Sequence, residues 1–133
     1  MAENANTDPA VVEAFVGAAH GDLDRVTEML TEDKELANAT WDWGGGDWET
    51  ALGAAAHMGR RDIAEHLMAH GARMDVFAAA MLGELDVVKA ILVANPSACD
   101  FPGPHGISLL DHAESGGDAA VSVVEHLQTL ARG

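Results

Sequence analysis

An internal repeat constrains the fold of this chain more than any other feature of its sequence. When the sequence is aligned with itself so that Phe15 meets Phe77, the segment AFVGAAHGDLDRVTEMLTEDKELAN falls on VFAAAMLGELDVVKAILVANPSACD. A similar shift places TALGAAAHMG on SLLDHAESGG. The chain therefore contains four related units, each with one marker glycine: Gly21, Gly59, Gly83 and Gly117. No unit of this size can bury an apolar face alone, so we expect the units to stack around one continuous core.

Each unit reads as two short helices on either side of its marker glycine. The first helix is small and alanine-rich, and the second carries apolar residues at helical spacing, such as Val26, Met29 and Leu30. The glycine suits the left-handed residue that ends a helix, and Asp8-Pro9 suits the start of the first helix. The sequence thus predicts an all-α fold in a single domain, 1–133. Its units are about 9–38, 39–71, 72–98 and 99–133.

Three helix–turn–helix segments resemble those of ankyrin-repeat proteins, of the small stand-alone bacterial type. They are AAHGDLDRVTEML, AAHMGRRDIAEHLMAHGA and AAMLGELDVVKAIL. TALGAA (50–55) and SLLDHA (108–113) stand where the family has a T-P-L-H-x-A signature, but they lack its proline and histidine. The resemblance covers nearly the whole chain. It implies an ankyrin-like solenoid that binds partners through a concave face.

The spacing of the marker glycines predicts two projecting fingers. The first and third gaps between successive marker glycines are 38 and 34 residues long. They leave room for two loops or hairpins that project from the stack, a first finger at residues 39–49 and a second finger at residues 99–106. The middle gap of 24 residues leaves no room for a third finger. In the ankyrin-like arrangement, two fingers should therefore flank a notch at the centre of the concave face.

The first finger reads TWDWGGGDW and holds all three tryptophans of the chain, Trp41, Trp43 and Trp48. Two interpretations of these aromatic residues stay open at this point. They form a structural lid over the helices beneath, or they form a wall that recognises a partner. The triple glycine allows the finger to fold back in either case.

The resemblance also indicates which residues face the notch, because the two positions before each marker glycine point toward the groove in ankyrin-like units. The two fingers supply the other candidates. Together the predicted binding residues are Trp41, Asp42, Trp43, Asp47, Trp48, His57, Met58, Met81, Leu82, Phe101 and His105. They predict a binding module that recognises a protein or peptide through its concave face and tryptophan-rich finger. The alternative is a small-molecule-binding protein or an enzyme that uses the aromatic and histidine notch. A deep pocket favours the small molecule, and an open groove across all four units favours the protein.

No recognised catalytic motif is present, and an enzyme would have to use His57, His105 and Asp42. His66 and His70 have a spacing that suits a metal, but no third ligand is evident near them, so the sequence predicts no metal and no cofactor. Asp111 and His112 are adjacent. Two interpretations of them stay open, a local hydrogen-bonded pair and a catalytic pair.

Charge and cysteine content restrict the partners further. The chain has 22 acidic and 7 basic residues and a net charge of −15, which repels phosphate backbones and anionic lipid. We therefore expect no nucleic-acid or membrane partner. The single Cys99 excludes an internal disulfide framework. The N-terminal segment MAENANTDPAVV has no export signal, so the sequence predicts a cytoplasmic monomer.

Overall fold

The computed structural model describes residues 8–132, which form eight α-helices and one small two-stranded sheet. The helices come in pairs along the chain: α1 (Pro9–Ala18) and α2 (Leu23–Glu32), α3 (Ala51–His57) and α4 (Arg61–Ala69), α5 (Val76–Leu82) and α6 (Leu85–Ala94), α7 (Leu109–Ser115) and α8 (Val121–Arg132). The predicted all-α class is confirmed in this mostly helical fold. Part of the segment used to predict the absence of an export signal, residues 1–7, lies outside the described residues.

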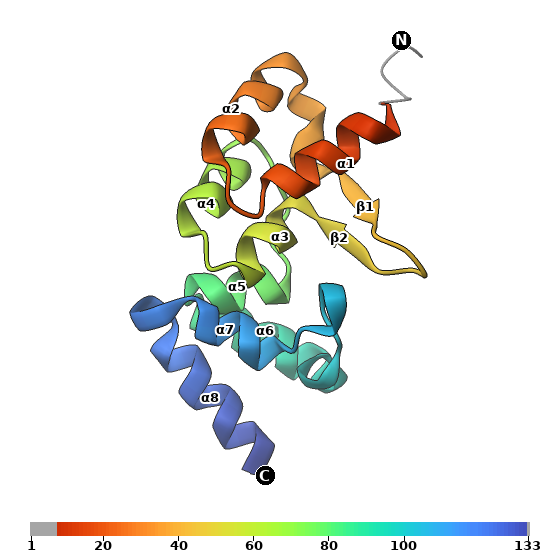
Figure 1. The fold of residues 1–133 in the computed structure, drawn as a ribbon. Coiled ribbons are helices and arrows are strands. Elements are labelled where there is room, and N and C mark those ends of the chain that lie inside the picture. The colour runs from red at the N-terminus through yellow and green to blue at the C-terminus, as the bar shows by residue number, and fades with distance from the viewer. Residues whose placement is uncertain (1–7, 133) are drawn as a thin grey trace.

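The helix pairs follow one another from the N-terminal to the C-terminal end of the molecule (Figure 1). The first helices of the pairs make one row, in which α1 contacts α3, α3 contacts α5 and α5 contacts α7. In the other row α2 contacts α4 and α6 contacts α8. No helix within residues 8–132 combines the length and apolar character needed to cross a bilayer.

The core runs through α5, which contributes to both of its parts. Met81 and Leu82 belong to the buried cluster of the N-terminal pairs, whereas Ala79 and Ala80 belong to that of the C-terminal pairs. Alanines on α3 and α5 are fully buried, so the short first helices approach one another closely. The predicted continuity of the core is thus supported by a helix that both clusters share.

The helix ends follow the predicted pattern at most positions. Asp8 caps α1 by accepting a hydrogen bond from the Ala10 N–H, and Pro9 is the first helical residue. Three of the four marker glycines have the predicted left-handed conformation. The φ angles of Gly59, Gly83 and Gly117 are 67°, 78° and 65°. The prediction for Gly21 is wrong. Its φ lies outside the left-handed region, and Asp22 instead caps α2 by accepting from the Arg25 N–H.

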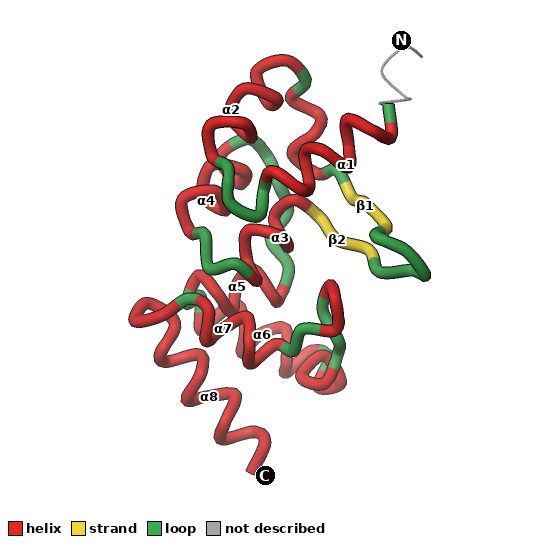
Figure 2. The backbone as a smooth tube through the Cα atoms, viewed as in Figure 1, coloured by secondary structure: helices red, strands yellow, loops and turns green. Residues whose placement is uncertain are grey.

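The two fingers have different structures. The first is a β-hairpin of β1 (Thr40–Asp42) and β2 (Trp48–Thr50), with Trp41 paired to Glu49. It follows the 3-10 helix η2 (Lys34–Asn38). The second finger contains the 3-10 helices η3 (Pro96–Asp100) and η4 (Pro104–Gly106) in place of strands. Figure 2 shows the hairpin and the second finger on the same side of the helical stack.

The predicted absence of a middle finger is confirmed. Residues 70–75 connect α4 to α5 without any strand, and the hairpin is the one sheet found between residues 8 and 132. The first and second fingers contact each other directly through Asp47 and His105. This contact positions the candidate site.

Candidate functional site

The triple glycine at the tip of the first finger is required by its backbone conformation. Gly44, Gly45 and Gly46 have φ of 132°, 66° and 85°, a region that side chains rarely adopt. The Asp42 carboxylate accepts hydrogen bonds from the N–H groups of Gly44 (2.8 Å) and Gly46 (3.1 Å). Asp42 was predicted as a binding residue of the notch. The structure places it outside the cavity lining, because its carboxylate is used to hold the glycine turn.

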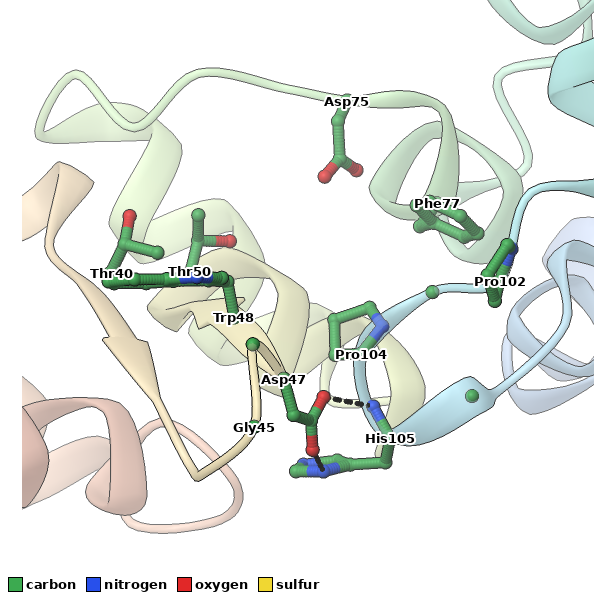
Figure 3. Close-up of a pocket in the computed structure, with 13 residues that line it drawn as sticks. Thr40, Gly45, Asp47, Trp48, Thr50, Asp75, Phe77, Pro102, Pro104 and His105 are labelled. Atoms are coloured by element: carbon green, nitrogen blue, oxygen red, sulfur yellow. Dashed lines mark hydrogen bonds and ion pairs between the residues drawn. The ribbon is translucent and has the colours of Figure 1, made fainter.

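Asp47 joins the first finger to the second. Its carboxylate accepts two hydrogen bonds from His105, one from the backbone N–H and one from Nδ1–H, each 2.7 Å long. Figure 3 shows both interactions. The backbone N–H of His105 is the main reason that the pKa of Asp47 lies below its ordinary value. His105 has a left-handed φ of 60°, which is uncommon for a residue with a side chain, and the two bonds stabilise that conformation.

The second junction between the fingers is a buried carboxylate with three histidines around it, which we call the Glu49 group: His20, Glu49, His57 and His105. Glu49 is 1% exposed. Its Oε1 accepts a hydrogen bond of 2.8 Å from the indole N–H of Trp43, and lies 3.2 Å from Nε2 of His20 and 3.4 Å from Nε2 of His105. Its Oε2 lies 2.9 Å from Nε2 of His57. Four segments of the chain therefore converge on one carboxylate.

Local structure orients the members of the Glu49 group. His20 follows α1, and its Nδ1–H donates to the carbonyls of Val16 (3.0 Å) and Gly17 (3.1 Å), which turns Nε2 toward Glu49. His57 is the last residue of α3. Glu49 lies directly before Thr50, whose side chain caps α3 by accepting from the Gly53 N–H. The cap fixes Glu49 and His57 at opposite ends of the same short helix.

The surroundings of Glu49 keep its carboxylate ionised. Burial alone would raise the pKa of the Glu49 carboxyl, but the ring nitrogens of His20 and His57 and the Trp43 N–H outweigh burial. The pKa of Glu49 is therefore held well below its ordinary value. In turn, the hydrogen bond to Glu49 raises the pKa of His20 above its ordinary value. Buried groups with perturbed pKa values beside a cavity are typical of functional sites.

We expect Glu49→Gln to change the pH dependence of stability in the metal-free chain. Glu49 has a lowered folded pKa, so its contribution is fully present above an unfolded pKa of about 4.3 and is lost as the pH falls through the folded value. His20 has a raised folded pKa, so its contribution is fully present below an unfolded pKa of about 6.5 and is lost as the pH rises through the folded value. The difference in unfolding free energy between the chain and the variant should therefore be largest between about pH 4.3 and 6.5. Urea unfolding from pH 3 to 9 measures it, and a pH-independent difference would contradict the assignment.

Two facing atoms of the Glu49 group have no hydrogen-bond partner in the part of the chain that the structure describes. They are Oε2 of Glu49 and Nε2 of His57, which are 2.9 Å apart but are not aligned as a hydrogen bond. Buried polar atoms are normally paired, so these two atoms indicate a site with a further binding capacity.

His112 lies behind this group, with its ring centroid 6.3 Å from that of His57. Its Nδ1–H donates to the Ser108 carbonyl (2.8 Å), and Asp111 is exposed. The predicted Asp111–His112 hydrogen-bonded pair is therefore wrong. Burial lowers the pKa of His112, which packs on Phe77 with a centroid distance of 4.7 Å.

A cavity of about 830 Å³ opens between the fingers and the start of α5. Figure 3 shows Trp48 and Thr50 on one side of it, Phe77 on the other, and the Asp75 carboxylate pointing into it. The full lining is Thr40, Gly45, Gly46, Asp47, Trp48, Thr50, Asp75, Phe77, Pro102, Gly103, Pro104, His105 and Gly106. The cavity adjoins the Glu49 group, because His105 belongs both to the lining and to the group. Asp47, another lining residue, is hydrogen-bonded to His105.

The base of the second finger depends on a small residue. A Cβ on Gly103 would lie 2.9 Å from His112 and 3.1 Å from Phe77. Glycine therefore lets the second finger pack directly onto these two rings.

Four of the residues predicted for the notch do come together. Two of them, His57 and His105, belong to the Glu49 group. The other two contact it: Trp43 donates to Glu49, and Asp47 accepts from His105. Trp48 lines the cavity and is 60% exposed. Trp41 packs against the N-terminal core, as a structural lid would.

The other predicted residues lie elsewhere. Met81 and Leu82 are buried, because their side chains pack into the core cluster of the N-terminal helix pairs. Met58 is exposed and lies outside the cavity lining. Phe101 is also exposed and outside the lining, because the chain turns at Pro102 and Gly103 before it reaches the cavity. Of the four binding residues predicted from their position before a marker glycine, none lines the cavity, and only His57 joins the Glu49 group.

Sequence reasoning missed Glu49, Phe77 and Asp75 and did not include His20 among the site residues. A signal for the histidines was present, since His20 and His57 both fall within the two positions before a marker glycine. Glu49 had no such signal, because its burial depends on the hairpin register and on groups from distant segments.

Comparison with protein-family models, with curated proteins and with solved structures gives no match for this chain.

Proposed function

We propose that this chain is a small-molecule-binding protein whose ligand occupies the cavity between the two fingers. The observation that carries the proposal is the composition of the lining of that cavity. Two aromatic rings, Trp48 and Phe77, and two carboxylates, Asp47 and Asp75, come from two separate segments to line one space of about 830 Å³. A volume of this size and a few convergent polar groups are typical of small-ligand sites.

The lining favours a small organic cation. None of the thirteen lining residues is lysine or arginine, and the chain as a whole carries a charge of −15. The Asp47 carboxylate is already bonded to His105, whereas Asp75 uses one oxygen to accept from the Ala78 N–H at the start of α5. Aromatic faces and a carboxylate are the groups that proteins use to bind ammonium ions.

The fold that we propose for the whole chain is an ankyrin-like solenoid. The helix pairs, the left-handed glycines between them and the missing middle finger support it. A protein or peptide partner at the concave face is the second candidate function, and the exposure of Trp48 and Phe101 favours it. The small-molecule proposal has more support, because the cavity is confined to the fingers and α5.

A pair of probes with the same skeleton and opposite charge tests the proposal. We expect phenethylamine to bind at least about tenfold more tightly than 3-phenylpropionate in isothermal titration calorimetry, with a chelator present. Asp75→Asn keeps a capping side chain at the start of α5 but removes the charge, so it should weaken amine binding by about fivefold or more.

The matched control is Asp86→Asn, which removes an exposed charge from the first turn of α6 outside the cavity lining. It should leave the affinity unchanged. Equal affinity for the two probes, or equal effects of the two substitutions, would overturn the proposal.

A further inference from the structure

We propose that the Glu49 group binds one Zn²⁺ ion through Nε2 of His20, His57 and His105 and the carboxylate of Glu49. This inference concerns a different site from the organic ligand and does not depend on it. The sequence predicted no metal, and the histidine pair that it singled out, His66 and His70, is not part of this group.

The donor set is one that zinc prefers. Three imidazole nitrogens and one carboxylate oxygen are common zinc ligands and make four bonds in a tetrahedral site. The four candidate ligand atoms all lie within 4.8 Å of one another. By contrast, His70 donates its Nδ1–H to the carbonyl of His66, and this pair joins no such group within residues 8–132.

The spacing around Glu49 fits a tetrahedral ion. With ligand bonds of about 2.0–2.1 Å, the ligand atoms of such an ion are separated by about 3.3 Å. Oε2 of Glu49 lies 2.9 Å from Nε2 of His57, and Oε1 lies 3.2 Å and 3.4 Å from Nε2 of His20 and His105. A small adjustment of side chains that already face one another would accommodate the ion.

In two of the three histidines, the other ring nitrogen is held by a group that orients the ring for metal binding. Nδ1–H of His20 donates to backbone carbonyls, and Nδ1–H of His105 donates to the Asp47 carboxylate. Such outer partners fix the ring and leave a lone pair on Nε2, the arrangement found at metal-binding histidines. When the rings are neutral, these nitrogen lone pairs face the oxygens of the carboxylate with no proton between them, so the nitrogens and oxygens repel each other. A cation bound among them would remove this repulsion.

The unpaired atoms give an independent indication of a ligand. Oε2 of Glu49 and Nε2 of His57 are buried, face each other and have no hydrogen-bond partner among the described residues. Trp43 donates to Oε1 and so leaves Oε2 free to bind. A zinc ion between Oε2 and Nε2 of His57 would satisfy both atoms.

The site has a path to solvent and a position next to the cavity. The side chains of His20 and His105 are 26% and 34% exposed. His105 also lines the cavity, so the ion would be bound at the junction of the two fingers. Zinc would thus tie together the end of α1, the hairpin, α3 and the second finger.

The test uses the full chain after dialysis against a chelator, with no organic ligand. We expect calorimetry to show one Zn²⁺ per chain, and Co²⁺ to give the visible absorption of a tetrahedral ion with nitrogen and oxygen ligands. His20→Gln, Glu49→Gln and His57→Gln should each weaken Zn²⁺ binding at least about tenfold, and Asp47→Asn should weaken it about tenfold or more through His105. The matched control is His66→Gln, which should have no effect.

Folding of each variant is checked by its circular dichroism and melting temperature in chelator. Zn²⁺ should raise the melting temperature of the unsubstituted chain, because the ion binds the folded state. Absence of Zn²⁺ binding, or an octahedral Co²⁺ spectrum, would overturn the proposal. So would binding that survives the substitutions in the Glu49 group, because the ion would then be held by surface carboxylates. Amine binding is measured with chelator present and zinc binding without an amine. The failure of one proposal can therefore be told apart from the failure of the other.

Discussion

Replacing Gly83 by alanine is expected to lower the unfolding free energy by roughly 2–5 kcal/mol. Gly83 has a φ of 78°, and a left-handed conformation costs about 1–2 kcal/mol for a residue with a Cβ. The added Cβ would also lie 2.1 Å from the Ala119 carbonyl oxygen, so the backbone must shift at a further cost of about 1–3 kcal/mol. Chemical denaturation measures the loss.

Gly117→Ala is the matched control for this substitution. Gly117 has a similar φ of 65°, but a Cβ there meets nothing within 4 Å. The control should therefore show only the conformational cost of about 1–2 kcal/mol. Equal losses in the two variants would contradict the close packing of α5 against the segment between α7 and α8.

Two of the tryptophans of the first finger, Trp41 and Trp48, should respond differently to truncation. Trp41 packs against the N-terminal core, so Trp41→Ala should cost about 2–3 kcal/mol of stability through lost burial and the cavity left behind. Trp48 is largely exposed, so Trp48→Ala should cost less than about 0.5 kcal/mol. It should nevertheless weaken amine binding about fivefold or more, because a ring of the cavity is removed. Thermal melts and calorimetry on the two variants give both numbers.

A different order of effects would contradict the division of roles. If Trp48→Ala destabilised the chain as much as Trp41→Ala, the lid interpretation would hold for both residues. If Trp41→Ala had no effect on stability, the packing of the hairpin on the core would be wrong.

The helices could be predicted from the sequence because their determinants are local or repeated. Asp8-Pro9 marks the start of α1, and the marker glycines of the later units end their first helices. The repeat also predicted the missing middle finger, since chain length alone excludes it. Gly21 departs from the pattern because Asp22 caps the next helix without a left-handed residue before it.

The site was predictable only in part because it depends on contacts between distant segments. The prediction placed Trp43, Asp47, His57 and His105 near the notch, and these residues do come together. No local pattern indicates that Glu49 is buried, because four segments have to meet around it. Met81 and Leu82 were misplaced because their side chains pack into the core cluster of the N-terminal helix pairs instead of facing the cavity.

The central claim is that the space between the two fingers is a ligand site. Amide and indole chemical shifts of the chain, recorded by NMR during titration with phenethylamine in chelator, test it most directly. The shifts should change in residues 40–50, 75–77 and 102–106, and at the indole of Trp48. They should stay constant in the second cavity of about 710 Å³, which is lined by Leu92 and Leu127 of α6 and α8. Changes in that second cavity, or none between the fingers, would contradict the claim.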